Sequence, residues 1–209
     1  METLLSVSIT QHDAKIQLSK ALKPIFKSEK PVKIICIGTD RLTGDSLGPL
    51  VGNLLQKASI DVMGTLKNPV TAIDIEKVLE ENNGFKDYCV LAIDACLGRS
   101  ENVGEVKLRE GSFSPGSGVG KDLPPVGDFN IIGIVNIGGF MEYMMLQNTR
   151  LNLVYEQAEL ISGAIQTAIT SDFVDDEPEL FSFEWACKAV GHPLPKSMQI
   201  EPEGEKTNV

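Results

Sequence analysis

The sequence predicts an α/β domain with a mainly parallel sheet and helices on both faces. Short apolar runs alternate along the chain with segments of helical periodicity, which is typical of this fold class. Two of these runs, Val32–Ile37 and Tyr88–Ile93, are almost free of charge, as buried parallel strands are. A length of 209 residues and an apolar fraction of 42% suit one sizeable core.

The first half of the chain alternates helix and strand. Residues 10–27 repeat apolar side chains at helical spacing, and we expect Pro24, inside that pattern, to end or kink the helix. The next predicted elements are a strand over 32–37, a helix over 47–58, a weaker strand over 61–66, a helix over 71–82 and a strand over 88–93. Asp45 or Ser46 is placed to cap the second helix, and Pro49 fits its first turn.

The second half continues the alternation around one long loop. Glu105–Arg109 alternates apolar and charged residues, as a half-exposed strand does, and Phe129–Asn136 is a further apolar strand. Residues 149–170 carry the longest helical pattern. Between these elements, eleven of the eighteen residues over 111–128 are Gly, Pro or Ser. A loop of this length inside a compact domain is usually functional or disordered.

These elements define one predicted domain over residues 1–172, followed by an acidic tail over 173–209. The net charge of the chain is −10, and the segment from Asp172 to Val209 holds nine acidic and three basic residues. An apolar patch at Leu180–Ala186 predicts a partly docked tail with a disordered end. The residues before this tail also carry a net negative charge, which argues against a nucleic-acid-binding face.

The sequence predicts a cytoplasmic protein. No stretch approaches the roughly 20 apolar residues of a membrane span, and the first residues lack the basic region of a secretory signal. None of the four cysteines has the spacing of a redox or zinc pair, which predicts reduced thiols.

Two aspartates lie near the carboxyl ends of two predicted strands. Asp94 directly follows the run 88–93, and Asp45 lies seven residues after Gly38, which ends the run 32–37. In an open parallel sheet, the carboxyl ends of neighbouring strands share one crevice. Two carboxylates that meet there can have their pKa values pushed apart, which suits hydrolysis, or they can hold a metal.

Each aspartate also has a purely structural interpretation. Asp45 fits a helix N-cap, and a helix N-terminus would lower its pKa and make it the ionised member of a pair. Asp94 fits a turn or an Asx cap for the loop that follows. From the residues alone, the structural and the functional interpretations both stay open.

Other chemistries find less support. The glycine string 116–121 fails as a P-loop, because Pro115 and Asp122 stand where glycine and a hydroxyl residue are needed. Its glycines fit an anion-binding nest, or a backbone that passes close to a bound peptide. The only histidines, His12 and His192, lie near the two ends of the chain, so neither nucleophilic catalysis nor a zinc or nickel site is favoured. We expect no metal and no cofactor.

Three motifs in order resemble the germination protease of spore-forming bacteria and, more closely, the smaller YyaC-type sporulation proteins. They are Ile37-Gly38 with Thr43–Pro49, then Ile93–Ala95, then Ser114–Gly120. The resemblance covers about residues 30–170. It implies the fold of the hydrogenase-maturation endopeptidase group, a three-layer α/β/α sandwich around a twisted sheet of the phosphorylase/hydrolase-like kind.

The resemblance also implies a function. It places the catalytic pair of an atypical aspartic-type peptidase on Asp45 and Asp94. Within this pair we expect Asp94, whose setting is apolar, to be the protonated acid, and Asp45 to be the ionised base that activates water. The expected substrate-binding residues are Gly38, Thr39, Ser114, Gly116, Ser117, Gly118 and Gly120. The implied partner is a peptide or protein substrate, with spore proteins as candidates, in the cytoplasm of the sporulating cell or forespore. A homo-oligomer is a further expectation.

Departures from the protease pattern leave a second hypothesis open. The protease has proline where this chain has Gly44, histidine where it has Ser114, and a different sequence where it has Lys121–Leu123. The chain can therefore be a catalytically inactive peptide-binding or regulatory sporulation protein that uses the same crevice. A third reading is metal-dependent maturation of another enzyme.

Overall fold

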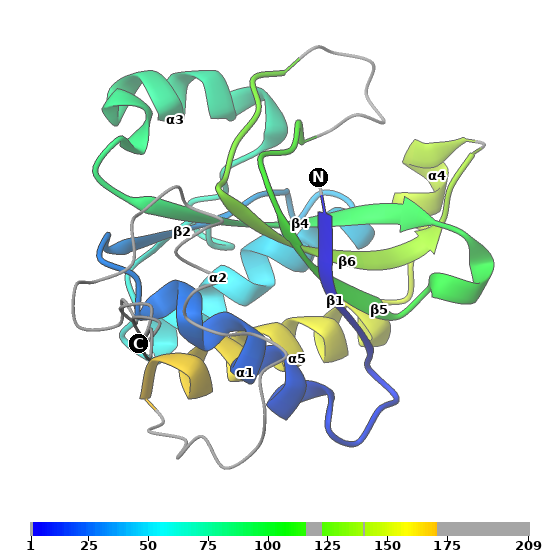
Figure 1. The fold of residues 1–209 in the computed structure, drawn as a ribbon. Helices are drawn as coiled ribbons and strands as arrows, with labels where there is room; N and C mark the ends of the chain where they lie inside the picture. The colour runs from blue at the N-terminus through cyan, green and yellow to red at the C-terminus, as the bar shows by residue number, and fades with distance from the viewer. Residues whose placement is uncertain (1, 116–122, 140, 171–209) are drawn as a thin grey trace, which may run out of the picture.

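A six-stranded mixed sheet forms the centre of the computed structural model, which describes residues 2–115, 123–139 and 141–170 (Figure 1). Its strand order is β1-β5-β6-β4-β2-β3. The strands are β1 (Glu2–Ser8), β2 (Val32–Cys36), β3 (Val62–Met63), β4 (Cys89–Gly98), β5 (Glu105–Glu110) and β6 (Phe129–Ile137). The pairs β2/β3, β2/β4 and β4/β6 are parallel, and β5 is antiparallel to both β6 and β1. Among these strands, β5 alone runs against the others, so the sheet is mainly parallel, as predicted.

Helices cover both faces of the sheet. The helices are α1 (Ala14–Phe26), α2 (Leu47–Lys57), α3 (Ile75–Glu81), α4 (Glu142–Gln147) and α5 (Leu151–Thr170). Helices α1, α2 and α5 pack on one face, and α3 lies on the other (Figure 1). Short α4 follows β6 and contacts the ends of β4 and β6. The predicted three-layer α/β/α sandwich is therefore confirmed.

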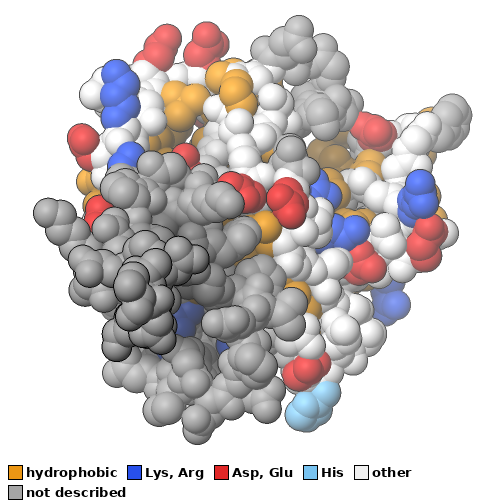
Figure 2. Space-filling model, viewed as in Figure 1, with side chains coloured by type: hydrophobic (Ala, Val, Ile, Leu, Met, Phe, Trp, Pro, Cys, Tyr) orange, Lys and Arg blue, Asp and Glu red, His pale blue; other side chains and the backbone are white. Residues whose placement is uncertain are grey.

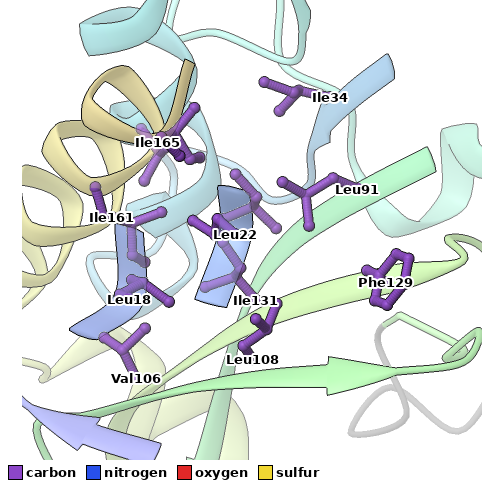
Figure 3. Close-up of a cluster of buried hydrophobic side chains, with 14 of the residues drawn as sticks. Leu18, Leu22, Ile34, Leu91, Val106, Leu108, Phe129, Ile131, Ile161 and Ile165 are labelled. Carbon is purple, nitrogen blue, oxygen red and sulfur yellow. The ribbon is translucent and has the colours of Figure 1, made fainter. Parts of the chain in front are cut away.

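Two hydrophobic cores lie on opposite faces of the sheet. Figure 3 shows the larger one, in which Leu22 of α1 and Ile165 of α5 point toward the strand residues Ile34, Leu91 and Ile131. The smaller one joins α3 to the other face of β2 and β4, and its members are Ile35, Ile37, Val70, Ile75, Val78, Phe85, Val90, Ala92 and Val126. Because successive strand residues point to opposite faces, one apolar run supplies both cores.

The predicted elements recur with small shifts, and three differences matter. Strand β1 was not predicted, because its partner β5 is about a hundred residues away and only one of its seven residues is buried. Helix α4 was not predicted either. Strand β4 was expected to end at Ile93 but continues to Gly98, because β6 stays paired with it over that length. Pro24 lies in the last turn of α1, which ends two residues later.

The described part of the molecule limits two further predictions. The tail, with its predicted docking patch, lies outside the described residues, and the domain boundary at residue 172 stays a prediction. Within the helices that the structure describes, none is long and apolar enough to cross a membrane. On the face shown in Figure 2, the acidic and basic side chains that are coloured are interspersed.

Candidate active site around two aspartates

The sheet opens at the point where β2 ends. Cys36, the last residue of β2, pairs with Ile93, and the backbone N–H of Ile37 donates to the Ile93 carbonyl at 2.7 Å. The chain then turns away at Gly38, while β4 continues beside β6. Asp94 is therefore flanked by Ile132 of β6 on one side and by the opening on the other. This is the crevice position that parallel-strand topology predicts.

Asp94 is buried, with 5% of its surface exposed. Its Oδ1 accepts a hydrogen bond from the backbone N–H of Ala95 at 2.8 Å. Burial raises the pKa of Asp94 well above its usual value, the nearby charge of Asp45 raises it further, and the Ala95 hydrogen bond lowers it. Because burial disfavours the charged form, Asp94 is the member of the pair that keeps its proton.

Asp45 lies in the 3-10 turn η1 (Gly44–Ser46), directly before α2. Its Oδ2 accepts a hydrogen bond from the backbone N–H of Thr39 at 3.1 Å, and the same N–H reaches the Asp45 carbonyl at 3.0 Å. Burial raises the pKa of Asp45 to about 6, against the lowering effect of the Thr39 hydrogen bond. The ionised form of Asp45 is thus accessible at neutral pH.

The structure corrects the prediction that Asp45 or Ser46 caps α2. Ser46 occupies the N-cap position and makes no side-chain cap hydrogen bond, and the Asp45 carboxylate turns back to Thr39 instead. The predicted lowering of the Asp45 pKa by the helix N-terminus was also wrong in direction, because the effect of burial is larger. The predicted order of the two pKa values is nevertheless retained, since the pKa of Asp45 is raised less than that of Asp94.

Gly38 has a structural reason to be glycine. Its φ of +135° lies where side chains are strained, and a Cβ there would approach the Asp45 carbonyl oxygen to 2.1 Å. The backbone N–H of Gly38 donates to the Val70 carbonyl at 2.9 Å, which fixes the turn from the other side. Gly38 and Thr39 therefore hold Asp45 in place through backbone contacts alone.

One pocket of about 590 Å³ contains both aspartates. Strand ends and the turns after them form one side, and α4 forms another. The lining residues with polar or ionisable side chains are Asp45, Asp94, Cys96, Arg109, Ser114, Glu142 and Tyr143. Its volume is typical of a site that encloses a small molecule or a few residues of a peptide.

The predicted substrate-binding residues divide into three groups. Gly38 and Ser114 line the pocket. Thr39 does not line it but orients Asp45. The four residues of the glycine string, Gly116, Ser117, Gly118 and Gly120, lie outside the described residues.

Sequence reasoning missed the polar residues that β5 and α4 contribute to the pocket. The alternating pattern of β5 predicts only that Arg109 lies on the charged face of a half-exposed strand. The antiparallel pairing of β5 with β6 determines that this face borders the pocket. Glu142 and Tyr143 lie on α4, which has six residues and no buried face that a pattern could reveal. No signal in the sequence places these residues beside Asp94.

Cys96 lines the pocket without the properties of a nucleophile. Burial raises its pKa to about 11, and while Arg109 lowers that pKa, Asp94 raises it. A thiol of this kind is almost fully protonated near neutral pH. In the described ranges, no group of three or more His, Cys, Asp or Glu side chains is arranged to hold a metal ion.

The family model described as "Protein of unknown function (DUF1256)" matches residues 6–164. The chain belongs to the DUF1256 family. The matched range includes both aspartates and every described strand and helix that lines the pocket. The uncharacterized protein YyaC of Bacillus subtilis (strain 168) is 51% identical over 140 residues, which are 65% of this chain and 68% of that protein. The predicted YyaC-type grouping of this DUF1256 protein is confirmed.

The solved structure of the [NiFe] hydrogenase maturation protease HycI from Thermococcus kodakarensis KOD1 superposes on this DUF1256 chain with a TM-score of 0.49 at 20% sequence identity. The superposition covers 72% of this chain and 99% of that one.

Proposed function

We propose that this protein is a peptidase-like hydrolase that uses Asp45 and Asp94 to activate water against a peptide bond. One observation supports this most directly: the two carboxyl groups line a single pocket, and both have raised pKa values, that of Asp94 more strongly. Paired carboxyl groups whose environments separate their pKa values are typical of acid–base catalysis.

The geometry suggests a role for each aspartate at neutral pH. Ionised Asp45 takes a proton from a water molecule, whose oxygen attacks the peptide carbonyl carbon. Protonated Asp94 donates its proton to the carbonyl oxygen and so neutralises the charge that develops there. When the tetrahedral intermediate collapses, Asp94 recovers this proton, the C–N bond breaks, and the leaving nitrogen takes the proton held by Asp45.

The substrate side of the proposal rests on the resemblance to the germination protease. We expect a peptide or protein substrate, with spore proteins as candidates, in the cytoplasm of the sporulating cell or forespore. A pocket of about 590 Å³ accommodates a few residues of an extended peptide around the reacting bond. The glycine string is expected to supply backbone donors to this peptide.

Asparagine variants test the catalytic pair. Purified protein is incubated with a peptide library from a bacterial proteome digest, and new chain ends are identified by mass spectrometry. We expect cleavage by the wild type, and a loss of at least about a hundredfold in Asp45→Asn and in Asp94→Asn. Both variants keep an oxygen that can accept the Thr39 or Ala95 N–H.

Asp128→Asn is the matched control. Asp128 is an exposed residue that also accepts a backbone N–H of β4, from Val90 at 2.8 Å, but it lies outside the pocket. Full activity in this control and none in the pocket variants supports the proposal. Retained cleavage in either pocket variant contradicts it.

A second candidate is a catalytically inactive peptide-binding protein that uses the same pocket. The observation that favours it is Ser114, which lines the pocket where the germination protease has histidine. The same library experiment separates the two candidates. A wild-type protein that retains peptides on a column, and never generates new chain ends, supports the binding function.

A further inference from the structure

Among the described residues that line the aspartate pocket, Arg109 is the one with a cationic side chain. It lies on β5, whose register with β6 places it opposite Asn130, and its side chain lines the pocket. Its Nε is buried and has no hydrogen-bond partner among the described residues. Within the same part of the chain, no carboxylate lies within the 4.0 Å that defines an ion pair with Arg109.

Lys107, the neighbouring cation on the same face of β5, differs from Arg109 because it has an ion-pair partner. Lys107 is two residues away, and its Nζ lies 3.0 Å from the Glu105 carboxylate. Buried N–H groups are nearly always hydrogen-bonded, because a buried donor without an acceptor destabilises the folded state. The described residues satisfy Lys107 and give the Arg109 guanidinium no acceptor. Because its Nε is buried while the side chain lines the pocket, a molecule in the pocket reaches this guanidinium through its terminal nitrogens.

We infer that Arg109 binds a carboxylate of the molecule that enters the aspartate pocket. A guanidinium presents two parallel N–H donors in a plane, and a carboxylate presents two acceptors with the matching separation. The inference rests on the proposed function, since it names a chemical group of the substrate for the same site.

The position of Arg109 relates this carboxylate to the bond that would be cleaved. Arg109 lies opposite Asn130 of β6, and Asn130 lies opposite Ala92 of β4, two residues before Asp94. Because neighbouring strands are about 4.8 Å apart and residues i and i+2 of a strand roughly 7 Å apart, the Cα atoms of Arg109 and Asp94 are roughly 12 Å apart, a distance that the long Arg109 side chain partly spans. A carboxylate held by Arg109 is therefore about one or two residues from a peptide carbonyl at Asp94.

Two sources of a carboxylate fit this spacing. One is the free C-terminus of a peptide, and the other is an acidic side chain next to the reacting bond. In either case Arg109 offsets the repulsion between the bound carboxylate and ionised Asp45, which lines the same pocket. Three probe peptides separate the sources: N-acetyl-trialanine, its C-terminal amide, and N-acetyl-Ala-Glu-Ala amide.

Nuclear magnetic resonance of the full chain reads out the contact directly. The Nε–H resonance of Arg109 is assigned by its loss in Arg109→Lys, and each probe is titrated into the wild-type protein. We expect this resonance to shift with at least one carboxylate probe and to stay in place with the neutral amide. Arg109→Gln should weaken carboxylate binding at least about tenfold, whereas the control Lys107→Gln should not change it.

The set of probes that shift the Arg109 resonance identifies the source of the carboxylate. A shift with N-acetyl-trialanine alone identifies the chain end as the source, a shift with the glutamate probe alone identifies the side chain, and a shift with both shows that the carboxylate suffices. Equal binding of the neutral amide, or no shift of the Nε–H with either carboxylate at the highest soluble concentration, overturns the inference. Binding needs no hydrolysis, so a protein that cleaves nothing still gives an answer.

Discussion

Replacing Asp45 with asparagine should stabilise the folded protein at neutral pH. Burial raises the pKa of Asp45 from 3.8 to about 6, which means that folding makes its ionised form less favourable than it is in the unfolded chain. Asparagine has the shape of the protonated acid and never ionises. Its side-chain oxygen can still accept the Thr39 N–H.

The size of the effect follows from the pKa shift. Each unit of pKa corresponds to about 1.4 kcal/mol, so a rise from 3.8 to about 6 corresponds to at most about 3 kcal/mol at neutral pH. Asp45 is only partly buried, and solvent screening reduces this value, so we expect about 1 to 3 kcal/mol. For a domain of this size, that is an increase in Tm of roughly 2 to 12 °C.

The pKa shift of Asp45 also fixes the direction in which the stability of the folded state changes with pH. Below the unfolded pKa of 3.8, Asp45 is protonated in both states and its stabilising neutral form is fully present. Between 3.8 and about 6, the folded state holds more protons than the unfolded state, so the stability falls as the pH rises. The wild type should therefore lose stability relative to Asp45→Asn across this window and keep a constant difference above pH 7.

Urea unfolding of both proteins at pH 4, 5, 6, 7 and 8, followed by circular dichroism, measures this difference. Asp128→Asn, in which an exposed aspartate outside the pocket is changed, serves as the control. A variant that is less stable than the wild type at pH 7, or a difference that is the same at pH 4 and pH 7, would refute the reasoning.

Two further predictions concern the same site. The kcat/KM of the proposed hydrolysis should rise as the pH increases through about 6, where Asp45 ionises, and fall at higher pH, where Asp94 loses its proton; a profile without the acid limb contradicts the assigned roles. Gly38→Ala should destabilise the fold by more than about 1 kcal/mol and lower kcat/KM, because a Cβ at φ +135° meets the Asp45 carbonyl at 2.1 Å; unchanged urea unfolding would show that the turn adapts.

The sequence predicted those parts of the fold and site that depend on short apolar runs. Strands β2, β4 and β6 are largely buried on both faces, so their runs are almost free of charge, and parallel topology then brings Asp45 and Asp94 to one crevice. The parts that could not be predicted depend on long-range pairing. The face of Arg109 follows from the register of β5 with β6, and β1 pairs with a strand about a hundred residues away.

Local rules also failed at Asp45 itself, for a reason that the sequence does not contain. Spacing before a helix favours a cap, and nothing in the chain shows that the Thr39 N–H lies close enough to compete for the same carboxylate. That competition is settled by Gly38, whose turn brings residue 39 against the Asp45 backbone. A cap and a turned-back aspartate have the same sequence pattern, so only the path of the connecting backbone distinguishes them.

Two separate costs in stability meet at the turn before α2, and their coincidence bears on function. Ser46, in the N-cap position, donates its hydroxyl to the Thr43 carbonyl, and the Asp45 carboxylate accepts the Thr39 N–H, so α2 begins without a side-chain cap, which forgoes about 1 kcal/mol. The burial of Asp45 adds the cost of ionising a partly dehydrated carboxylate. An asparagine at 45 would relieve this second cost and keep an acceptor for the Thr39 N–H. Residues that break local rules in this concentrated way are expected where a site, rather than stability, determines the side chains.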